Sequence, residues 1–158
     1  MKIYDDFLKL DDHKNLYELM VQSPLIDWHF YNGVNMPRDG NYQFSHLFYA
    51  EFQPRSKFFN NILPIIDKLK PISIVRIKSN LNIRTFERIN FGLHTDVDNC
   101  ITAIYYVNSN DGYTYFEDGT KVDSIANRMV IFNSNMKHAG CTPTDELCRC
   151  VINFNYHL

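Results

Sequence analysis

The sequence has little of what marks several large classes of protein. Its 158 residues include one tryptophan and four cysteines, and no apolar run approaches the roughly 18 residues of a membrane-spanning helix. Neither sign of charge dominates, because 16 lysines and arginines face 18 aspartates and glutamates, for a net charge of −2. This balance argues against a protein built mainly to bind nucleic-acid backbone, so nucleic acid is not an expected partner.

The N-terminus and the cysteines bear on the compartment. The first residues, Met-Lys-Ile-Tyr-Asp-Asp, lack the apolar segment of a secretory signal, so we expect a cytoplasmic protein with no membrane partner and reduced thiols. Cys141, Cys148 and Cys150 follow the pattern C-x6-C-x-C, which matches no common zinc site and indicates small, semi-buried residues at strand ends. A cysteine enzyme with Cys141 as nucleophile beside His138 is an alternative interpretation.

The length of 158 residues suits one domain over residues 1–158, and an aromatic content of 15% favours a β-rich fold. Residues 1–71 are interpreted as a helical support region. One helix is expected to run through Met20 with Asp11 or Asp12 as its N-cap. A second helical pattern covers Ser56–Leu69, where Pro64 either kinks or restarts the helix.

The pattern changes at Ile72, where short strands begin to alternate with turns. Turns are expected at Asn110–Gly112 and Asp118–Gly119, and strands over Ile72–Ile77, Cys100–Val107, Tyr113–Phe116, Met129–Phe132 and Cys148–Tyr156. This spacing predicts a mainly β fold with N-terminal helices, in which residues 72–158 form a jelly-roll core.

Three residues have the chemistry of an open metal site. His94 and Asp96 form an H-x-D pattern, and in a strand residues two apart point to the same face. His138 follows the expected strand Met129–Phe132 and supplies a third ligand. Two histidines and one carboxylate occupy one face of an octahedron and leave the other positions open, as in non-haem Fe(II) oxygenases. The alternative is a simple His–Asp hydrogen bond at a loop edge.

Arg149 is a candidate anion-binding residue. In the strand that begins near it, Arg149, Val151 and Asn153 share one face, while Cys150, Ile152 and Phe154 share the other. An arginine inside a barrel needs a counter-charge, and a carboxylate ligand supplies one in bidentate geometry. The alternatives are an arginine that reaches solvent or pairs with Asp145 or Glu146.

The ordered set of these segments resembles one known family. H-T-D, C-I-T-A-I-Y-Y-V-N, D-G-Y-T-Y-F-E-D-G, N-R-M-V-I-F-N-S-N-M-K-H and R-C-V-I-N-F-N-Y are together similar to Fe(II)- and 2-oxoglutarate-dependent dioxygenases. Within these, the chain resembles the prolyl-4-hydroxylase-like branch in its small stand-alone bacterial and phage form. The likeness covers Ile72–Leu158.

The resemblance implies a cupin-like double-stranded β-helix that binds Fe(II) through His94, Asp96 and His138. It assigns the distal carboxylate of 2-oxoglutarate to Arg149 and Tyr106, with Tyr105 as the less favoured tyrosine. Thr102 shares the strand face of Tyr106 and is grouped with it as a cosubstrate contact. Dioxygen is the further cosubstrate, and ascorbate is an accessory reductant.

The implied reaction hydroxylates an unidentified peptide or small-molecule substrate and releases succinate and carbon dioxide. Family analogy favours a prolyl residue, and a free amino acid or a nucleobase are the other candidates. The chain has Ile77 where the family often has a cosubstrate-binding tyrosine, and Lys78–Gly92 is interpreted as a lid or substrate loop. Basic residues that favour an anionic partner lie near the expected entrance: Arg76, Lys78, Arg84 and Arg88.

Two other classes of function compete with this interpretation. One is a non-catalytic cupin-like jelly roll that binds a metal or small molecule and has no need of Arg149. The other is a structural or interaction domain, such as a virion jelly roll, in which the H-x-D pattern is accidental.

Overall fold

Two antiparallel β-sheets form the framework of the computed structural model, which describes residues 1–158. The larger sheet has eight strands in the order β1-β9-β6-β11-β5-β3-β2, with β4 paired to β3. Its strands are β1 (Lys2–Tyr4), β2 (His29–Tyr31), β3 (Gln43–Ala50), β4 (Gln53–Pro54), β5 (Ser73–Ile83), β6 (Ile101–Tyr106), β9 (Arg128–Asn133) and β11 (Cys148–His157).

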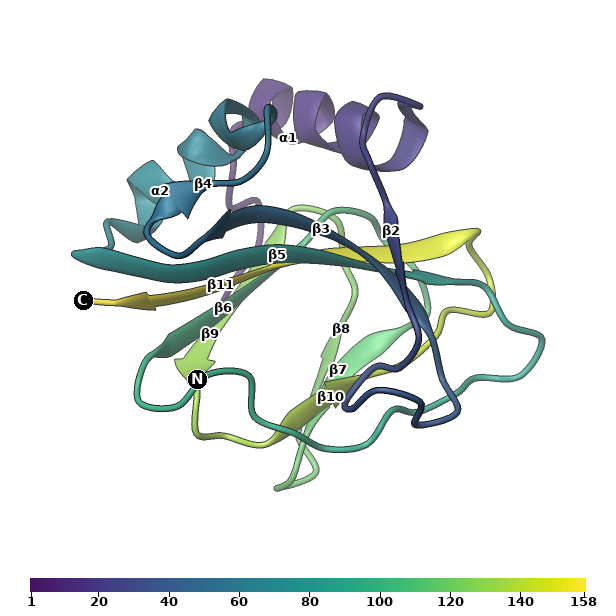
Figure 1. The fold of residues 1–158 in the computed structure, drawn as a ribbon. Coiled ribbons are helices and arrows are strands. Elements are labelled where there is room, and N and C mark those ends of the chain that lie inside the picture. The colour runs from purple at the N-terminus through teal and green to yellow at the C-terminus, as the bar shows by residue number, and fades with distance from the viewer.

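The smaller sheet has the order β10-β7-β8, with β7 at Tyr113–Phe116, β8 at Lys121–Asp123 and β10 at His138–Gly140. It lies below the larger sheet in Figure 1, while the helices cover the opposite face. This arrangement agrees with a jelly-roll architecture of mainly antiparallel strands. None of the helices combines the length and the hydropathy of a membrane-spanning segment.

The helices follow the sequence pattern except at their caps. α1 (Leu10–Tyr17) continues into a π-helical turn at Glu18–Gln22, and its N-cap is Lys9. The prediction that Asp11 or Asp12 caps this helix is therefore wrong. Both residues lie in the first turn, where the positive end of the helix dipole stabilises a carboxylate.

The second helical pattern is split near Pro64, which agrees with the prediction that this proline restarts the helix. A 3₁₀ turn at Phe59–Ile62 precedes α2 (Leu63–Leu69), which has Pro64 in its first turn. The missing N–H of proline costs nothing at this position, so the helix restarts rather than kinks. Lys70 takes a left-handed conformation (φ 50°) and ends the helix before Pro71.

The two faces of β11 contribute to two separate hydrophobic clusters. Cys150, Ile152 and Phe154 belong to the large hydrophobic core between the larger sheet and the helices. Val151 belongs to a smaller cluster with Ile104, Tyr106, Phe116, Val122, Val130 and Phe132, on the side that faces the smaller sheet. Arg149 and Asn153 share the face of Val151 and line a cavity there. The predicted division of this strand into two faces is confirmed.

Residues 1–71 contribute more to the sheets than the predicted helix and loop. Strands β1 to β4 all lie in this region; β3 pairs with β5, and β1 pairs with β9. The larger sheet therefore crosses the expected boundary at residue 72. The predicted lid over Lys78–Gly92 is also wrong in its first part, because β5 extends to Ile83.

Candidate metal centre and cavity

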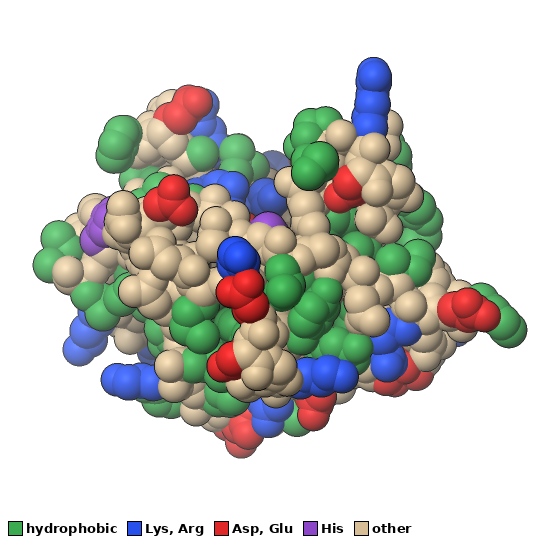
Figure 2. Space-filling view, turned by 90° about the horizontal axis from the view of Figure 1, so that it is seen from below, with side chains coloured by type: hydrophobic (Ala, Val, Ile, Leu, Met, Phe, Trp, Pro, Cys, Tyr) green, Lys and Arg blue, Asp and Glu red, His purple; other side chains and the backbone are tan.

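A polar cavity of about 230 Å³ lies against the inner faces of β5 and β11. Figure 2, seen from below relative to Figure 1, shows a hollow with lysine or arginine and histidine side chains at its floor. The ladder between the two strands sets its floor, because Asn82 pairs with Arg149 and Lys78 with Asn153. Residues two apart in each strand face the same side, so these four side chains all line the cavity.

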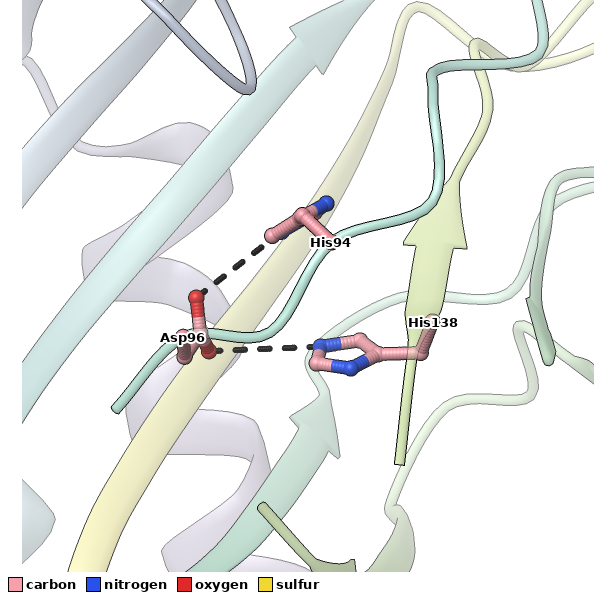
Figure 3. A group of neighbouring side chains, drawn as sticks. All are labelled: His94, Asp96 and His138. Carbon is pink, nitrogen blue, oxygen red and sulfur yellow. Dashed lines mark ion pairs between the residues drawn. The ribbon is translucent and has the colours of Figure 1, made fainter. Parts of the chain in front are cut away.

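The structure brings the three predicted metal ligands together at one side of this cavity. His94 Nε2 lies 3.8 Å from Asp96 Oδ1, and His138 Nε2 lies 4.0 Å from Asp96 Oδ2. Figure 3 shows the two imidazoles converging on the carboxylate from separate segments. One ligand atom from each residue lies within 4.8 Å of the others, so a single ion can contact all three.

The backbone holds the two histidines side by side. His94 N–H donates to His138 C=O and His138 N–H donates to His94 C=O, each at 3.0 Å, in an isolated β-bridge. His138 opens β10, whereas His94 and Asp96 lie on an irregular segment rather than in a strand. The bridge, not strand alternation, therefore aligns the H-x-D pair with His138.

Hydrogen bonds to the backbone fix the orientation of both imidazoles. The Nδ1 atoms of His94 and His138 each lie 3.1 Å from a carbonyl oxygen two residues earlier, those of Gly92 and Met136. A carbonyl only accepts, so each Nδ1 carries the proton and each Nε2 keeps its lone pair toward Asp96. Burial lowers the pKa of His138 below its ordinary value, an effect that Asp96 opposes, and burial thus favours the neutral, ligating form.

The carboxylate of Asp96 fits a cation in this position. Its Oδ2 atom is buried and has no hydrogen-bond partner, while Arg76 Nη2 lies 3.4 Å from Oδ1. An unsatisfied buried carboxylate oxygen is costly unless a cation or donor reaches it. Two neutral imidazole nitrogens and this oxygen form the donor set that an open Fe(II) site uses.

Arg149 is a buried cation with no acidic partner. The residue is 3% exposed; its Nε donates to Ser124 Oγ and its Nη2 to Thr114 Oγ1, both at 2.9 Å. Neither Asp145 nor Glu146 forms an ion pair with it, and Nη1 has no hydrogen-bond partner within the protein.

Two glycines leave the space that Arg149 occupies. A Cβ at Gly112 would lie 2.8 Å from its Cδ, and one at Gly140 would lie 3.0 Å from its Nη1. The guanidinium is therefore held in a fitted cradle at the edge of the cavity.

The two tyrosines of β6 point to opposite sides. Tyr106 O–H donates to Thr114 Oγ1 at 2.8 Å, and its ring lies 5.6 Å from the Arg149 guanidinium. Tyr105 faces the large core and donates to Asn127 Oδ1. Tyr106 is therefore the tyrosine beside Arg149, but it is fully buried and does not itself line the cavity. The hydroxyl of Thr114, which lines the cavity, accepts from both Tyr106 and Arg149, so its own proton is available to a further acceptor.

Thr102 lies apart from this group. It shares the strand face of Tyr106, but it is fully buried, does not line the cavity, and accepts a hydrogen bond from Asn155 Nδ2 at 3.1 Å. Ile77 is buried in the large core, so the cavity wall at this level is Lys78 and Asn80 instead. Arg84 is exposed and Arg88 pairs with Asp111, and neither lines the cavity.

The sequence motifs do not single out a row of asparagines and one threonine in the cavity. Asn80, Asn82 and Asn153 line the cavity, and each has a buried side-chain atom without a hydrogen-bond partner. The alternation of Lys78, Asn80 and Asn82 indicates one face of a strand, whereas the lid prediction treats this segment as a loop. Thr114 alternates in the same way with Tyr113 and Tyr115 in β7.

The cysteines do not form a second centre. All four are free thiols, and burial raises the pKa of Cys141 above its ordinary value. A buried thiol with a raised pKa is a weak nucleophile at neutral pH, and Nε2 of His138 faces Asp96. The alternative of a Cys141 nucleophile is therefore disfavoured.

Comparison with known proteins gives matches of structure alone. No family model and no curated protein sequence matches the chain. A prolyl hydroxylase from Trichoplax adhaerens, solved with a hypoxia inducible factor peptide fragment, has a TM-score of 0.60 at 17% identity, over 99% of this chain and 82% of that one. A Pseudomonas putida prolyl-4-hydroxylase has a TM-score of 0.62 at 14% identity, over 99% and 92%.

A 2OG-Fe(II) oxygenase family protein from Burkholderia pseudomallei has a TM-score of 0.63 at 11% identity, over 91% of this chain and 78% of that one. The chain is thus similar in fold to prolyl hydroxylases and 2-oxoglutarate oxygenases. The resemblance seen in the sequence is borne out at this level.

Proposed function

We propose that this protein is an Fe(II)- and 2-oxoglutarate-dependent dioxygenase of the prolyl-4-hydroxylase-like type, and that its two sheets form a double-stranded β-helix. The observation that carries the proposal is the cavity itself, which joins a His-Asp-His ligand set to the buried, unpaired Arg149. The first feature is suited to a metal with open positions, and the second to a carboxylate ligand.

Each residue has a defined task in this proposal. His94, Asp96 and His138 hold the iron, and their fixed tautomers present Nε2 lone pairs without reorganisation. Arg149 binds the distal carboxylate of 2-oxoglutarate through its free Nη1, and the free Thr114 proton adds a second donor. Tyr106 supports this pair through Thr114 and the Arg149 guanidinium.

With 2-oxoglutarate and dioxygen, the bound iron supplies the oxidising chemistry, and succinate and carbon dioxide are the co-products. The protein orients the cosubstrate between Arg149 and the metal ligands and encloses the reacting groups between two sheets. The prolyl hydroxylases among the similar structures make prolyl compounds the first substrates to test, and ascorbate is the reductant to include in the assay.

The proposal is tested by following succinate by NMR after Fe(II), 2-oxoglutarate and air are added. We expect slow succinate formation without substrate, and its loss in His94→Ala and Asp96→Ala. Asp98→Ala, which removes an exposed carboxylate two residues further on, is the matched control and should keep wild-type turnover. A protein that binds metal but forms no succinate above free iron would instead support the non-catalytic cupin-like alternative.

A further inference from the structure

A second cationic group lies on the same cavity floor as Arg149. Arg76 and Lys78 are two apart in β5, and both side chains are half-buried and line the cavity. Arg76 is also the residue that contacts Asp96, so this pair lies beside the metal ligands. The proposed reaction assigns no role to either residue.

The strand register separates this pair from Arg149. Arg149 pairs with Asn82, whereas Lys78 pairs with Asn153, four residues along β11. At about 3.3 Å per residue, these positions are about 13 Å apart along the strand. Ser124 and Thr114 hold the Arg149 guanidinium at its own end. In the proposed binding mode, a five-carbon dicarboxylate extends from Arg149 to the metal ligands, so both of its carboxylates are used at those two places and neither is left for Lys78.

The two cations have donors that nothing in the protein uses. Arg76 Nε is buried and lacks an acceptor, although Nη2 reaches Asp96 and Asn155. Lys78 has no hydrogen bond or ion pair within the protein, and burial, aided by Arg76, lowers its pKa. Asp96 is the one carboxylate that lines the cavity, and the metal uses it. Two like charges on one face are stabilised when an anion lies between them.

Unpaired acceptors and the small volume of the cavity further define the ligand. Asn80 Oδ1, two residues along β5 from Lys78, and Asn153 Oδ1, opposite Lys78 on β11, are buried and unpaired, and they can accept from an ammonium or hydroxyl group. Asn35, which lines the cavity, donates through Nδ2 to Gly92 C=O at 2.6 Å and links the loop after β2 to the segment before His94. The volume of about 230 Å³ is below the roughly 300–1,000 Å³ of drug-sized sites.

We propose that Arg76 and Lys78 bind the carboxylate of a small-molecule substrate, and that free amino acids, proline included, are its chemical class. The proposal rests on the proposed dioxygenase function for its reaction. The carboxylate lies across the two cations, and the polar group next to it bonds the asparagine oxygens. The substrate carbon then lies beside the metal ligands, on the side away from Arg149.

Binding is tested without iron, so that its failure is separate from failure of the oxygenase proposal. Sodium propionate and neutral propionamide are titrated into metal-free protein, with the Arg76 Nε–H signal followed by ¹⁵N NMR. We expect a saturable shift with propionate only. Lys78→Gln should weaken it about tenfold, the loss of one charge-assisted hydrogen bond. Lys14→Gln, on the exposed face of α1, makes the same charge change and should leave it unaltered.

The active enzyme gives a second test with matched substrates. Succinate formation is compared for L-proline, L-prolinamide and a capped prolyl peptide, and then for the other amino acids with their amides. We expect stimulation by a free acid and not by its amide, with the KM for that acid raised in Lys78→Gln and the KM for 2-oxoglutarate unchanged.

Three results would overturn the inference. These are an Arg76 signal that does not move with propionate, stimulation by the capped peptide alone, and a Lys78→Gln effect confined to the KM for 2-oxoglutarate. None of them contradicts the dioxygenase proposal, which depends on succinate formation.

Discussion

Arg149 is the residue whose environment explains most about the site. A buried guanidinium without a carboxylate partner is costly, and the fold surrounds this one with two hydroxyls and two glycines instead of an acid. Such an arrangement costs stability in the free protein, and the proposed carboxylate ligand would restore it. Removal of the Arg149 charge should therefore weaken ligand binding without lowering the stability of the ligand-free protein.

We predict that Arg149→Met lowers the affinity for 2-oxoglutarate about 100-fold or more and leaves the ligand-free protein as stable as the wild type or about 1 kcal/mol more stable. Urea denaturation and 2-oxoglutarate titration measure the two effects. Arg128→Met is the control, because Arg128 pairs with Asp5 at the surface and should not affect the cosubstrate. A large loss of stability in Arg149→Met with unchanged affinity would mean that Arg149 is purely structural.

Gly140 allows a finer test of the same guanidinium. An alanine Cβ there would lie 3.0 Å from Arg149 Nη1, which is the end of a flexible side chain and can shift by a few tenths of an ångström. We expect Gly140→Ala to fold normally and to bind 2-oxoglutarate about tenfold more weakly. In a double-mutant cycle with Arg149→Met, the glycine substitution should have no further effect. An independent, additive loss would place the cause elsewhere.

At the scale of elements, a buried hydrogen-bond network joins α1 to the larger sheet. Tyr105 O–H on β6 donates to Asn127 Oδ1, so the tyrosine oxygen accepts from His13 Nδ1 on α1 at 2.8 Å. Asn127 also bonds both backbone groups of Leu8 just before the helix. The network fixes the helix on the face opposite the cavity, where the large core lies.

We predict that Tyr105→Phe lowers the free energy of unfolding by about 1–2 kcal/mol, because His13 and Asn127 lose a shared buried partner. Tyr113→Phe removes an exposed hydrogen bond to Asn90 and is the matched control, with an expected change within about 0.5 kcal/mol. Chemical denaturation of the metal-free proteins measures both. Equal effects in the two variants would show that the network adds nothing beyond a surface hydrogen bond.

Several elements could be predicted from the sequence because their signals are local. The strand Tyr113–Phe116 has the predicted bounds, and Pro64 starts a helix because its ring geometry acts on its own residue. β3 was missed because Ser45 and His46 interrupt its apolar pattern, and what makes it a strand is pairing with β5 thirty residues later. β1 and β2 have three residues each, and all of these residues are exposed. Such strands are too short to show an alternation of apolar and polar residues in the sequence.

The site also has residues that could be predicted from the sequence and residues that could not. Residue type and order were enough to select His94, Asp96, His138 and Arg149, and the structure places all four at one cavity. The partners of Arg149 were not predictable, because Thr114 and Ser124 reach it only through the packing of the smaller sheet. Thr102 was grouped by strand face alone, which does not say how far along the strand the cavity extends.

At the scale of the whole molecule, pH should act on stability through two histidines. Burial lowers the pKa of His13 and of His138 below the ordinary value of 6.5. The unfolded chain therefore binds more protons than the folded one below this pH, and stability falls with acidification. The loss of stability begins near pH 6.5 and is complete below the pKa values that the two histidines have in the folded protein.

We expect the free energy of unfolding of the metal-free protein to decrease from neutral pH to about pH 5, with a shallower slope in His13→Gln. The carboxylates of Asp39 and Asp111 have pKa values lowered to about 2, so their contribution is lost only in stronger acid. Urea denaturation across this range measures the slope. A free energy that stays constant or rises on acidification would contradict the burial of neutral histidines.

In the proposed site, one cavity holds a metal through His94, Asp96 and His138 and a carboxylate cosubstrate through Arg149. Anaerobic titration of the protein with Fe(II) and 2-oxoglutarate, followed by visible absorption, tests both halves at once. We predict a metal-to-ligand charge-transfer band at one equivalent of iron, absent in Asp96→Ala and shifted to higher 2-oxoglutarate concentration in Arg149→Met. A wild-type protein that binds iron but develops no band on addition of 2-oxoglutarate would contradict the account.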